Sequence, residues 1–130
     1  MHWLIYLVVG LVALLAWTQF MAYRRAKQTE GRAAPDTAGI DGEAHGEPRR
    51  VYYFFAAQCG PCRAITPLVD RLRVTHRNLV KVDVAEAPEI ARGFGIAATP
   101  SFVVVENGTI RTVRLGGQSE TQLLDLLRAE

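Results

Sequence analysis

Two cysteines carry the most specific chemistry in this chain of 130 residues, and both stand in one tetrapeptide, Cys59-Gly60-Pro61-Cys62. The tetrapeptide follows a strand-like apolar run, residues 51–57, and precedes a helix-like pattern. Two thiols at this spacing can close a disulfide with each other. A helix start stabilises the thiolate of the first cysteine, because unpaired N–H groups and the helix dipole favour negative charge there. The motif therefore predicts two-electron exchange between a dithiol and a disulfide.

A zinc site is the competing interpretation, since a paired-cysteine motif is also half of a common zinc ligand set. Zinc would need two further ligands, and the three histidines, His2, His45 and His76, fall in unrelated parts of the chain. We therefore predict no metal site. Nor does the sequence favour nucleic-acid binding, because it has no basic stripe interleaved with aromatic residues. The cysteine count leaves open whether the compartment is reducing or oxidising.

Hydrophobic patterns predict the elements that position the motif. The run at 51–56 is typical of a strand buried on both faces, and the helical pattern at 65–72 contains Pro67, which should kink it. The remaining elements are strands at 79–84, 101–106 and 109–115, a short helix at 88–94, and a terminal helix that begins with a capping box of Ser119 and Gln122. This order predicts an α/β fold with a four-stranded mixed sheet between helices.

Residues 3–23 predict a transmembrane helix that anchors the chain in the inner (cell) membrane by a single pass through the lipid bilayer. The stretch has no charged residue, is long enough to cross a hydrocarbon core, and has Trp or Tyr near both ends. A cleaved signal peptide and a buried core helix are the alternatives. Arg24, Arg25 and Lys27 follow the stretch and no cation precedes it. The positive-inside rule then places the remaining chain in the cytoplasm, with a periplasmic location as the alternative.

Residues 24–48 are predicted to be a basic juxtamembrane segment and a flexible acidic tether. From Gln28 to Pro48 there are five acids, one base and no apolar periodicity. Such a stretch buries too little apolar surface to offset its ordering entropy. The predicted globular domain therefore occupies residues 49–130.

The motifs of residues 49–130 resemble those of the thioredoxin family. The tetrapeptide matches that family's active-site box, and Pro67 matches the proline inside its active-site helix. Thr99-Pro100 matches the segment that holds a cis-proline facing the dithiol, and Asn107-Gly108 and Gly116 fit the same template. The resemblance implies a trimmed thioredoxin fold, βαβαββα, in which the family's usual first strand and helix are absent.

The resemblance also implies roles for individual residues and a class of partner. Cys59 would attack a substrate disulfide, Cys62 would resolve the mixed disulfide, and no cofactor would be bound. Gly60 and Pro61 would tune the redox poise. The residues implied in substrate binding are Gln58, Thr99, Pro100 and Gly116. The implied partners are protein disulfide substrates and an upstream reductant, which is thioredoxin reductase in the cytoplasm or a membrane electron-transfer protein in the periplasm.

Two departures from the family pattern leave a second interpretation open. Thioredoxins usually have Trp directly before the first cysteine, where this chain has Gln58, and a buried Asp six residues before it, where this chain has Tyr53. Lys81 matches a lysine that commonly neighbours that Asp, and it is a candidate proton-transfer group. The alternative function is therefore a redox-inactive or weakly active binding or scaffold module for a membrane partner.

Overall fold

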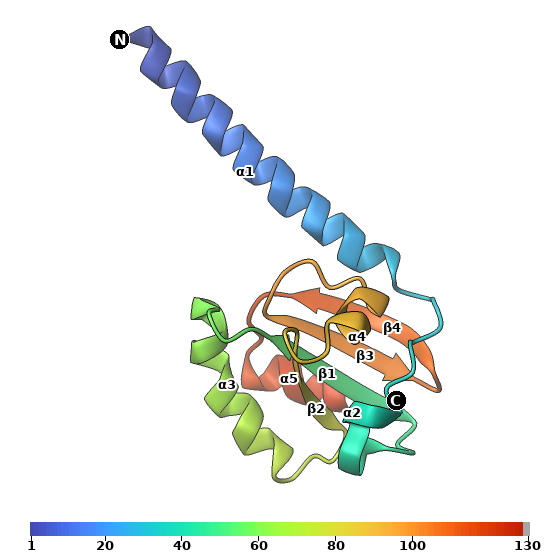
Figure 1. Cartoon of the computed structure of the whole chain (residues 1–130). Helices are drawn as coiled ribbons and strands as arrows, with labels where there is room; N and C mark the ends of the chain where they lie inside the picture. Colours follow the sequence, from blue (N-terminus) through green and yellow to red (C-terminus); the bar gives the residue numbers. More distant parts are fainter. Residues whose placement is uncertain (129–130) are drawn as a thin grey trace.

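The computed structural model describes residues 1–128, and Figure 1 shows a long amino-terminal helix joined to an α/β domain. The elements in chain order are α1 (His2–Gln28), α2 (Ala38–Asp41), the 3-10 turn η1 (Gly42–Ala44), β1 (Arg49–Phe55), α3 (Gly60–Arg73), β2 (Leu79–Asp83), α4 (Pro88–Gly93), β3 (Ser101–Glu106), β4 (Thr109–Leu115) and α5 (Glu120–Leu127). From β1 onward this is the predicted order, with most boundaries within two residues of the expected ones.

The sheet has four strands in the order β2-β1-β3-β4. The β1 and β2 strands are parallel, as a strand–helix–strand crossover requires, whereas β3 is antiparallel to both β1 and β4. The mixed sheet predicted from the sequence is therefore confirmed. Asn107 and Gly108 make the β3–β4 turn with positive φ angles of 51° and 78°, the conformation for which Asn-Gly is favoured.

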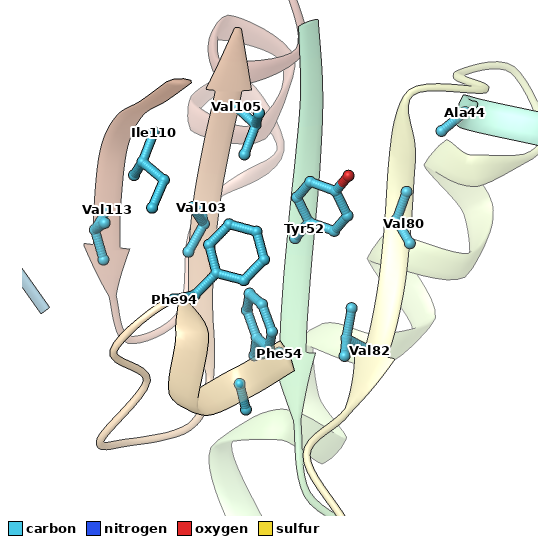
Figure 2. Packing of buried hydrophobic residues seen from close by; sticks show 11 residues of the cluster. Ala44, Tyr52, Phe54, Val80, Val82, Phe94, Val103, Val105, Ile110 and Val113 are labelled. Atoms are coloured by element: carbon cyan, nitrogen blue, oxygen red, sulfur yellow. The ribbon is translucent and has the colours of Figure 1, made fainter. Parts of the chain in front are cut away.

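Alternate residues of the central strands enter two hydrophobic clusters, one on each face of the sheet. Val51 and Tyr53 of β1 pack with side chains from α3 and α5, whereas Tyr52 and Phe54 pack with Phe94 and neighbours from α4 and η1. Figure 2 shows the second cluster, where the Phe94 ring lies over Tyr52 and Phe54. All of these β1 side chains are fully buried, which explains the uninterrupted apolar run in the sequence.

The prediction of a flexible tether is wrong for most of residues 29–48. Two residues of this segment exchange backbone hydrogen bonds with β4: Gly31 donates to the Ile110 carbonyl, and the Arg32 carbonyl accepts from the Ile110 N–H. Ala33 forms an isolated antiparallel bridge with Thr109. The segment therefore lies along the outer edge of β4 and is part of the domain, which begins well before residue 49.

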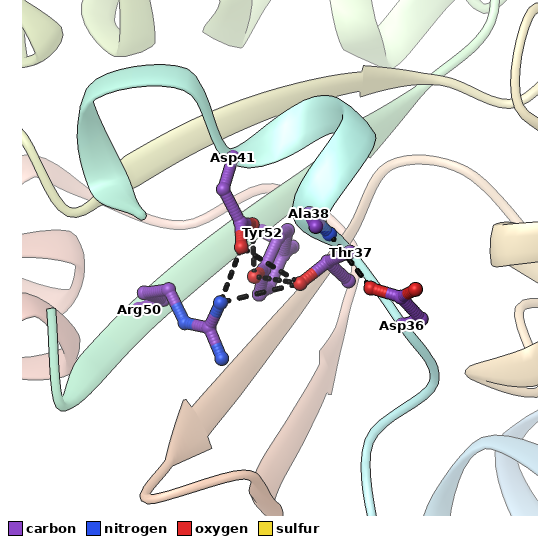
Figure 3. A network of polar contacts seen from close by, with 6 residues as sticks. All are labelled: Asp36, Thr37, Ala38, Asp41, Arg50 and Tyr52. Atoms are coloured by element: carbon purple, nitrogen blue, oxygen red, sulfur yellow. Dashed lines mark hydrogen bonds and ion pairs between the residues drawn. The ribbon is translucent and has the colours of Figure 1, made fainter. Parts of the chain in front are cut away.

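A buried polar network fixes the following part of the same segment to β1 (Figure 3). Asp41 is a buried residue, 4% exposed. Its carboxylate forms an ion pair with Arg50 and accepts a hydrogen bond from the Tyr52 hydroxyl. Thr37 donates to Asp41 at 2.9 Å and accepts from Arg50, and its hydroxyl oxygen lies 2.9 Å from that of Tyr52. A single turn of helix, α2, holds Thr37 and Asp41 at the spacing that this network needs.

The α1 helix is straight, continues past the predicted anchor to Gln28, and projects away from the domain (Figure 1). Residues 2–25 are long and apolar enough to cross a membrane, and none of this window is buried against the rest of the described chain. Its large apolar side chains are therefore exposed, which is the pattern of a helix that contacts something other than its own domain.

Candidate active site: a disulfide at the start of helix α3

Cys59 and Cys62 form a disulfide, with their Cα atoms 5.2 Å apart. Cys59 is the N-cap residue of α3: its backbone is extended, and its sulfur accepts a hydrogen bond from the Cys62 N–H at 3.2 Å. The same N–H is available to stabilise a thiolate when the pair is reduced. This local geometry explains why the first cysteine of the motif has to stand directly before the helix.

The two sulfur-bearing residues differ in their access to solvent. Cys59 is 8% exposed and Cys62 is 2% exposed, whereas Gly60 and Pro61 between them are exposed. Pro61 occupies the first turn of α3, where its missing N–H costs no helical hydrogen bond. The helix continues through Pro67 to Arg73. Cys59 is therefore the more exposed of the two cysteine residues.

Three loops meet at the end of the sheet next to the disulfide, where strands β1 and β4 end and β3 begins. The strand register places Phe54 opposite Ser101, and Ser101 opposite Leu115, so β1 and β4 end where β3 begins. The loops that leave this edge contain Gln58 and the cysteines, Thr99-Pro100, and Gly116. The sequence-predicted residues of the motif and of the two flanking loops thus share one end of the domain.

The loop before β3 contains the predicted cis peptide bond, between Thr99 and Pro100. The Pro100 carbonyl accepts a hydrogen bond from the Gly116 N–H at 2.9 Å, and Ser101 Oγ donates to the Ala98 carbonyl at 2.6 Å. Gly116 has a φ of +85°, which favours glycine. The two candidate substrate-binding loops are therefore bonded to each other, while Gln58 is exposed beside the disulfide. Substrate contact by these residues stays a prediction.

Two hydroxyl groups hydrogen-bond to the Cys62 carbonyl, and one of them belongs to Tyr53, which stands where the family pattern has Asp. The fully buried Tyr53 donates a hydrogen bond to the Cys62 carbonyl at 3.3 Å, and Thr66 donates to the same carbonyl at 2.7 Å. Burial raises the pKa of Tyr53, the Thr66 hydrogen bond offsets part of this rise, and the charge of Asp70 adds to it. The phenol is therefore protonated at neutral pH and cannot serve there as a base.

Lys81 lies beside Tyr53 in the β1–β2 register, but its ammonium group is bound elsewhere. It forms an ion pair with Asp70 of α3 at 2.9 Å and lies 5.2 Å from the centre of the Phe55 ring. The side chain is 23% exposed. Proton transfer by Lys81 remains a prediction.

Sequence reasoning missed Thr66 and Asp70 as neighbours of the site. Thr66 stands four residues after Cys62, a spacing that places both on one side of a helix and lets a hydroxyl reach the earlier carbonyl. From this spacing, the contact between Thr66 and the Cys62 carbonyl could have been predicted. Asp70 stands four residues after Thr66, but its pairing with Lys81 depends on how α3 crosses β2. No group of three His, Cys, Asp or Glu side chains suited to a metal ion occurs within residues 1–128.

The structure thus places a disulfide at a helix start, beside a cis-proline loop, at one end of a mixed sheet with the thioredoxin fold. Comparison with known proteins agrees: the thioredoxin family model matches residues 44–129. The chain belongs to the thioredoxin family.

Curated relatives include thioredoxin-1 of Caenorhabditis elegans, 38% identical over 49% of this chain and 57% of its own length. Another is thioredoxin of Rickettsia felis, 33% identical over 55% of this chain and 71% of its own length. The chain thus spans little more than half of the worm protein. Among solved structures, a mutant thioredoxin from Halobacterium salinarum has a TM-score of 0.61 and 27% identity, covering 73% of this chain and 84% of its own. Schistosoma mansoni thioredoxin has a TM-score of 0.57 and 36% identity, covering 64% and 77% respectively.

Proposed function

We propose that this protein is a membrane-tethered thiol–disulfide oxidoreductase that reduces protein disulfides by dithiol exchange through Cys59 and Cys62. The observation that carries the proposal is the position of this pair, with the more exposed cysteine capping α3 at the sheet edge where the Pro100 loop lies. Family membership supports the same chemistry.

In the first step, the reduced Cys59 thiolate attacks one sulfur of a substrate disulfide. A mixed disulfide forms between Cys59 and the substrate, and the other substrate sulfur leaves as a thiolate. The Cys62 N–H and the start of α3 stabilise the attacking thiolate. An extended substrate segment would lie across Gln58 and the Thr99 backbone, beside Gly116.

In the second step, the Cys62 thiolate attacks the Cys59 sulfur and releases the second substrate thiol. The substrate has then gained two electrons, and the enzyme carries the Cys59–Cys62 disulfide seen in the structure. Cys62 must lose a proton for this step, and Lys81 is the proposed acceptor. An upstream dithiol donor returns the pair to its reduced state. This donor is thioredoxin reductase if the domain is cytoplasmic, or a membrane electron-transfer protein if it is periplasmic.

Reduction of insulin disulfides by the full chain in detergent micelles tests the catalytic proposal. We expect turnover with dithiothreitol as the donor and its complete loss in Cys59→Ser. Cys62→Ser, reduced beforehand and then freed of dithiothreitol, should instead accumulate a mixed disulfide with insulin, because Cys59 can attack but no second thiol is present to resolve the product. The absence of both turnover and the trapped species would refute the proposal.

A binding or scaffold module is the second candidate, and the site offers one observation in its favour. Tyr53 has a neutral hydroxyl where the family pattern has a carboxylate, and Thr66, which bonds to the same Cys62 carbonyl, supplies no base either. A module of this kind would bind a membrane partner through the Pro100 loop without turnover. The insulin assay distinguishes the two candidates.

We further propose that α1 spans the inner membrane once and that the domain is cytoplasmic. Support comes from the exposed apolar length of residues 2–25 and from Arg24, Arg25 and Lys27 directly after the uncharged stretch. An alkaline phosphatase fusion to the carboxyl terminus tests the orientation, since this reporter is active only outside the cytoplasm. We expect an inactive fusion. An active one would place the domain in the periplasm and change the class of electron donor.

A further inference from the structure

The segment between α1 and the domain runs along β4 in a direction that brings α1 to the active-site end. The contacts of this segment can be followed from Ala34 toward the amino terminus. Ala34 donates to the Gly108 carbonyl, the Arg32 carbonyl accepts from the Ile110 N–H, and the Glu30 carboxylate accepts from the Val113 N–H. Each step toward the amino terminus is thus a step along β4 toward Leu115 and Gly116. The segment thus reaches the carboxyl end of α1 by running along β4 toward Leu115 and Gly116, and Figure 1 shows this end of α1 beside β4 and α4.

Both loops beside the disulfide share cavities with the carboxyl end of α1. Tyr23 and Lys27 line a cavity of ≈ 500 Å³ together with Leu115 and Gln118, which flank Gly116. Arg25 and Gln28 line another of ≈ 480 Å³ with Ile96 and Ala97, which precede the cis-proline. Because the apolar window of α1 ends at Arg25, these loops lie at the level where the helix leaves the hydrocarbon.

The joint between α1 and the domain has several fixed contacts. Lys27 Nζ forms an ion pair with Glu30 at 3.0 Å and donates to the Val113 carbonyl. Gly95 packs so closely that a Cβ atom there would lie 2.5 Å from Thr29 Cγ2 and 3.6 Å from the Arg25 carbonyl oxygen. These contacts hold the domain at one orientation relative to α1.

Charged side chains differ between the two ends of this direction along β4: cations lie at one end and acids at the other. The cations Arg25, Arg32 and Arg92 line the cavity beside Gly95, at the membrane end. The acids Asp36 and Glu47 line a cavity beside Asn107 and Gly108, at the opposite end of β4. Anionic lipid headgroups attract the first end and repel the second, so membrane electrostatics favour the orientation that the joint imposes.

We infer that the disulfide site faces the membrane surface, and that the substrate class is a disulfide in a protein segment lying within a few residues of the bilayer. The inference rests on the proposed function, which it narrows from protein disulfides in general to membrane-proximal ones. A domain on a free tether would sample all orientations and show no such preference.

A distance measurement tests the orientation without using activity. Gln58→Cys and Val74→Cys, each in a Cys59→Ser/Cys62→Ser background, place an exposed labelling site at either end of α3, about 20 Å apart at 1.5 Å per residue. The full chains are labelled with a donor fluorophore and reconstituted in liposomes that carry acceptor-labelled headgroups. We expect at least twofold greater energy transfer from position 58. Equal transfer, or greater transfer from position 74, would overturn the inference.

A substrate comparison tests the consequence. Wild-type protein is reconstituted with a single-pass peptide whose disulfide loop lies about five residues from the bilayer, or with one whose loop lies about forty residues away on a Gly/Ser spacer. We expect the near loop to be reduced at least fivefold faster. A ten-residue Gly/Ser insertion between Gln28 and Thr29 should remove this difference and leave insulin reduction unchanged.

The two proposals fail in distinguishable ways. Normal insulin reduction with equal rates for the near and far loops would refute the membrane-facing site and leave the oxidoreductase proposal intact. Loss of insulin reduction in the wild type would refute the oxidoreductase proposal, whatever the energy-transfer result.

Discussion

At the scale of single residues, the distinctive feature of this site is a pair of hydroxyls bonded to the carbonyl of the buried cysteine. Tyr53 and Thr66 both donate to the Cys62 carbonyl, at 3.3 and 2.7 Å. Neither hydroxyl is ionised at neutral pH, so neither supplies a base for the Cys62 thiol. The proton that Cys62 loses during resolution has to reach another group or solvent.

Tyr53 makes the stability of the fold depend on alkaline pH. Burial raises the pKa of Tyr53 above the ordinary value of about 10. The stabilising contribution of its protonated form is therefore complete below about pH 10 and is lost as the pH rises through the higher folded-state pKa. We expect Tyr53→Phe to cost about 1 kcal/mol near pH 8, with the difference from wild type shrinking toward about pH 11. Urea unfolding across this range measures the effect.

The control for this experiment is Tyr23→Phe, which alters an exposed phenol. Its stability should follow the wild-type profile throughout. Parallel profiles for wild type and Tyr53→Phe would contradict the assignment of the alkaline transition to Tyr53.

Lys81 offers the second residue-level prediction, for the resolution step. If its amine accepts the proton from Cys62, Lys81→Met should slow release of the second substrate thiol several-fold at pH 7. Asp70→Asn breaks the 2.9 Å ion pair but keeps the amine, so it is the matched control and should not slow this step. Stopped-flow measurement of mixed-disulfide decay separates the two variants. An unchanged rate in Lys81→Met removes this residue from the mechanism.

At the scale of elements, the segment from Thr29 to Pro48 acts as a clamp across the domain. Its first half pairs with the outer edge of β4, and its second half is fixed to β1 by the network around Asp41. The Asp41 side chain is 1% exposed and that of Arg50 is 15% exposed, so the ion pair is largely removed from solvent. Loss of the Asp41 carboxylate would leave a largely buried guanidinium group without this counter-charge.

We expect Asp41→Ala to lower the free energy of unfolding by about 3 kcal/mol, in the range for removing one partner of a buried ion pair. Asp41→Asn keeps an acceptor for the Tyr52 hydroxyl and should cost less. Asp36→Ala, at an exposed position in the same segment whose carboxylate accepts from the Ala38 N–H, should cost about 1 kcal/mol or less. Equal losses for Asp41→Ala and Asp36→Ala in urea unfolding would argue against the clamp.

The sequence predicts the elements of the domain well because each leaves a repeating or local signal. The β1 strand is an unbroken apolar run, the β3–β4 turn is an Asn-Gly pair, and α5 begins with a capping box that the structure confirms. The clamp leaves no such signal. Its contacts are backbone pairing with β4 and one polar network joining Asp41 to residues of β1, so its acidic, glycine-rich composition looks like that of an unfolded segment.

The active site also has parts with a local sequence signal and parts that depend on how distant elements pack. The cysteine pair and the cis-proline are local motifs, and the structure confirms the disulfide and the cis bond. The hydroxyl contacts to the Cys62 carbonyl depend instead on which face of α3 meets β1. A single sequence indicates that Tyr53 replaces the usual Asp, but it does not show that Thr66 shares the same carbonyl.

At the scale of the whole molecule, the proposed membrane location depends on the amino-terminal helix. Residues 2–25 extend about 36 Å as a helix, enough for a hydrocarbon core of about 30 Å. We expect the chain to stay in the membrane fraction after an alkaline carbonate wash. Leu11→Arg/Leu14→Arg should release it, because each charge at the centre of a span costs about 3 kcal/mol. Gln28→Arg, outside the span, is the control and should stay bound. A wild-type chain found in the supernatant would refute the anchor.

The pairing of Ala33 with Thr109 has a consequence for any attempt to isolate the domain. The clamp shields the outermost strand of the sheet, whose N–H and C=O groups would otherwise be free to recruit a strand from another molecule. A protein that begins at residue 49 would expose this edge, and its tendency to aggregate would come from the missing cover and not from a weakness in the core.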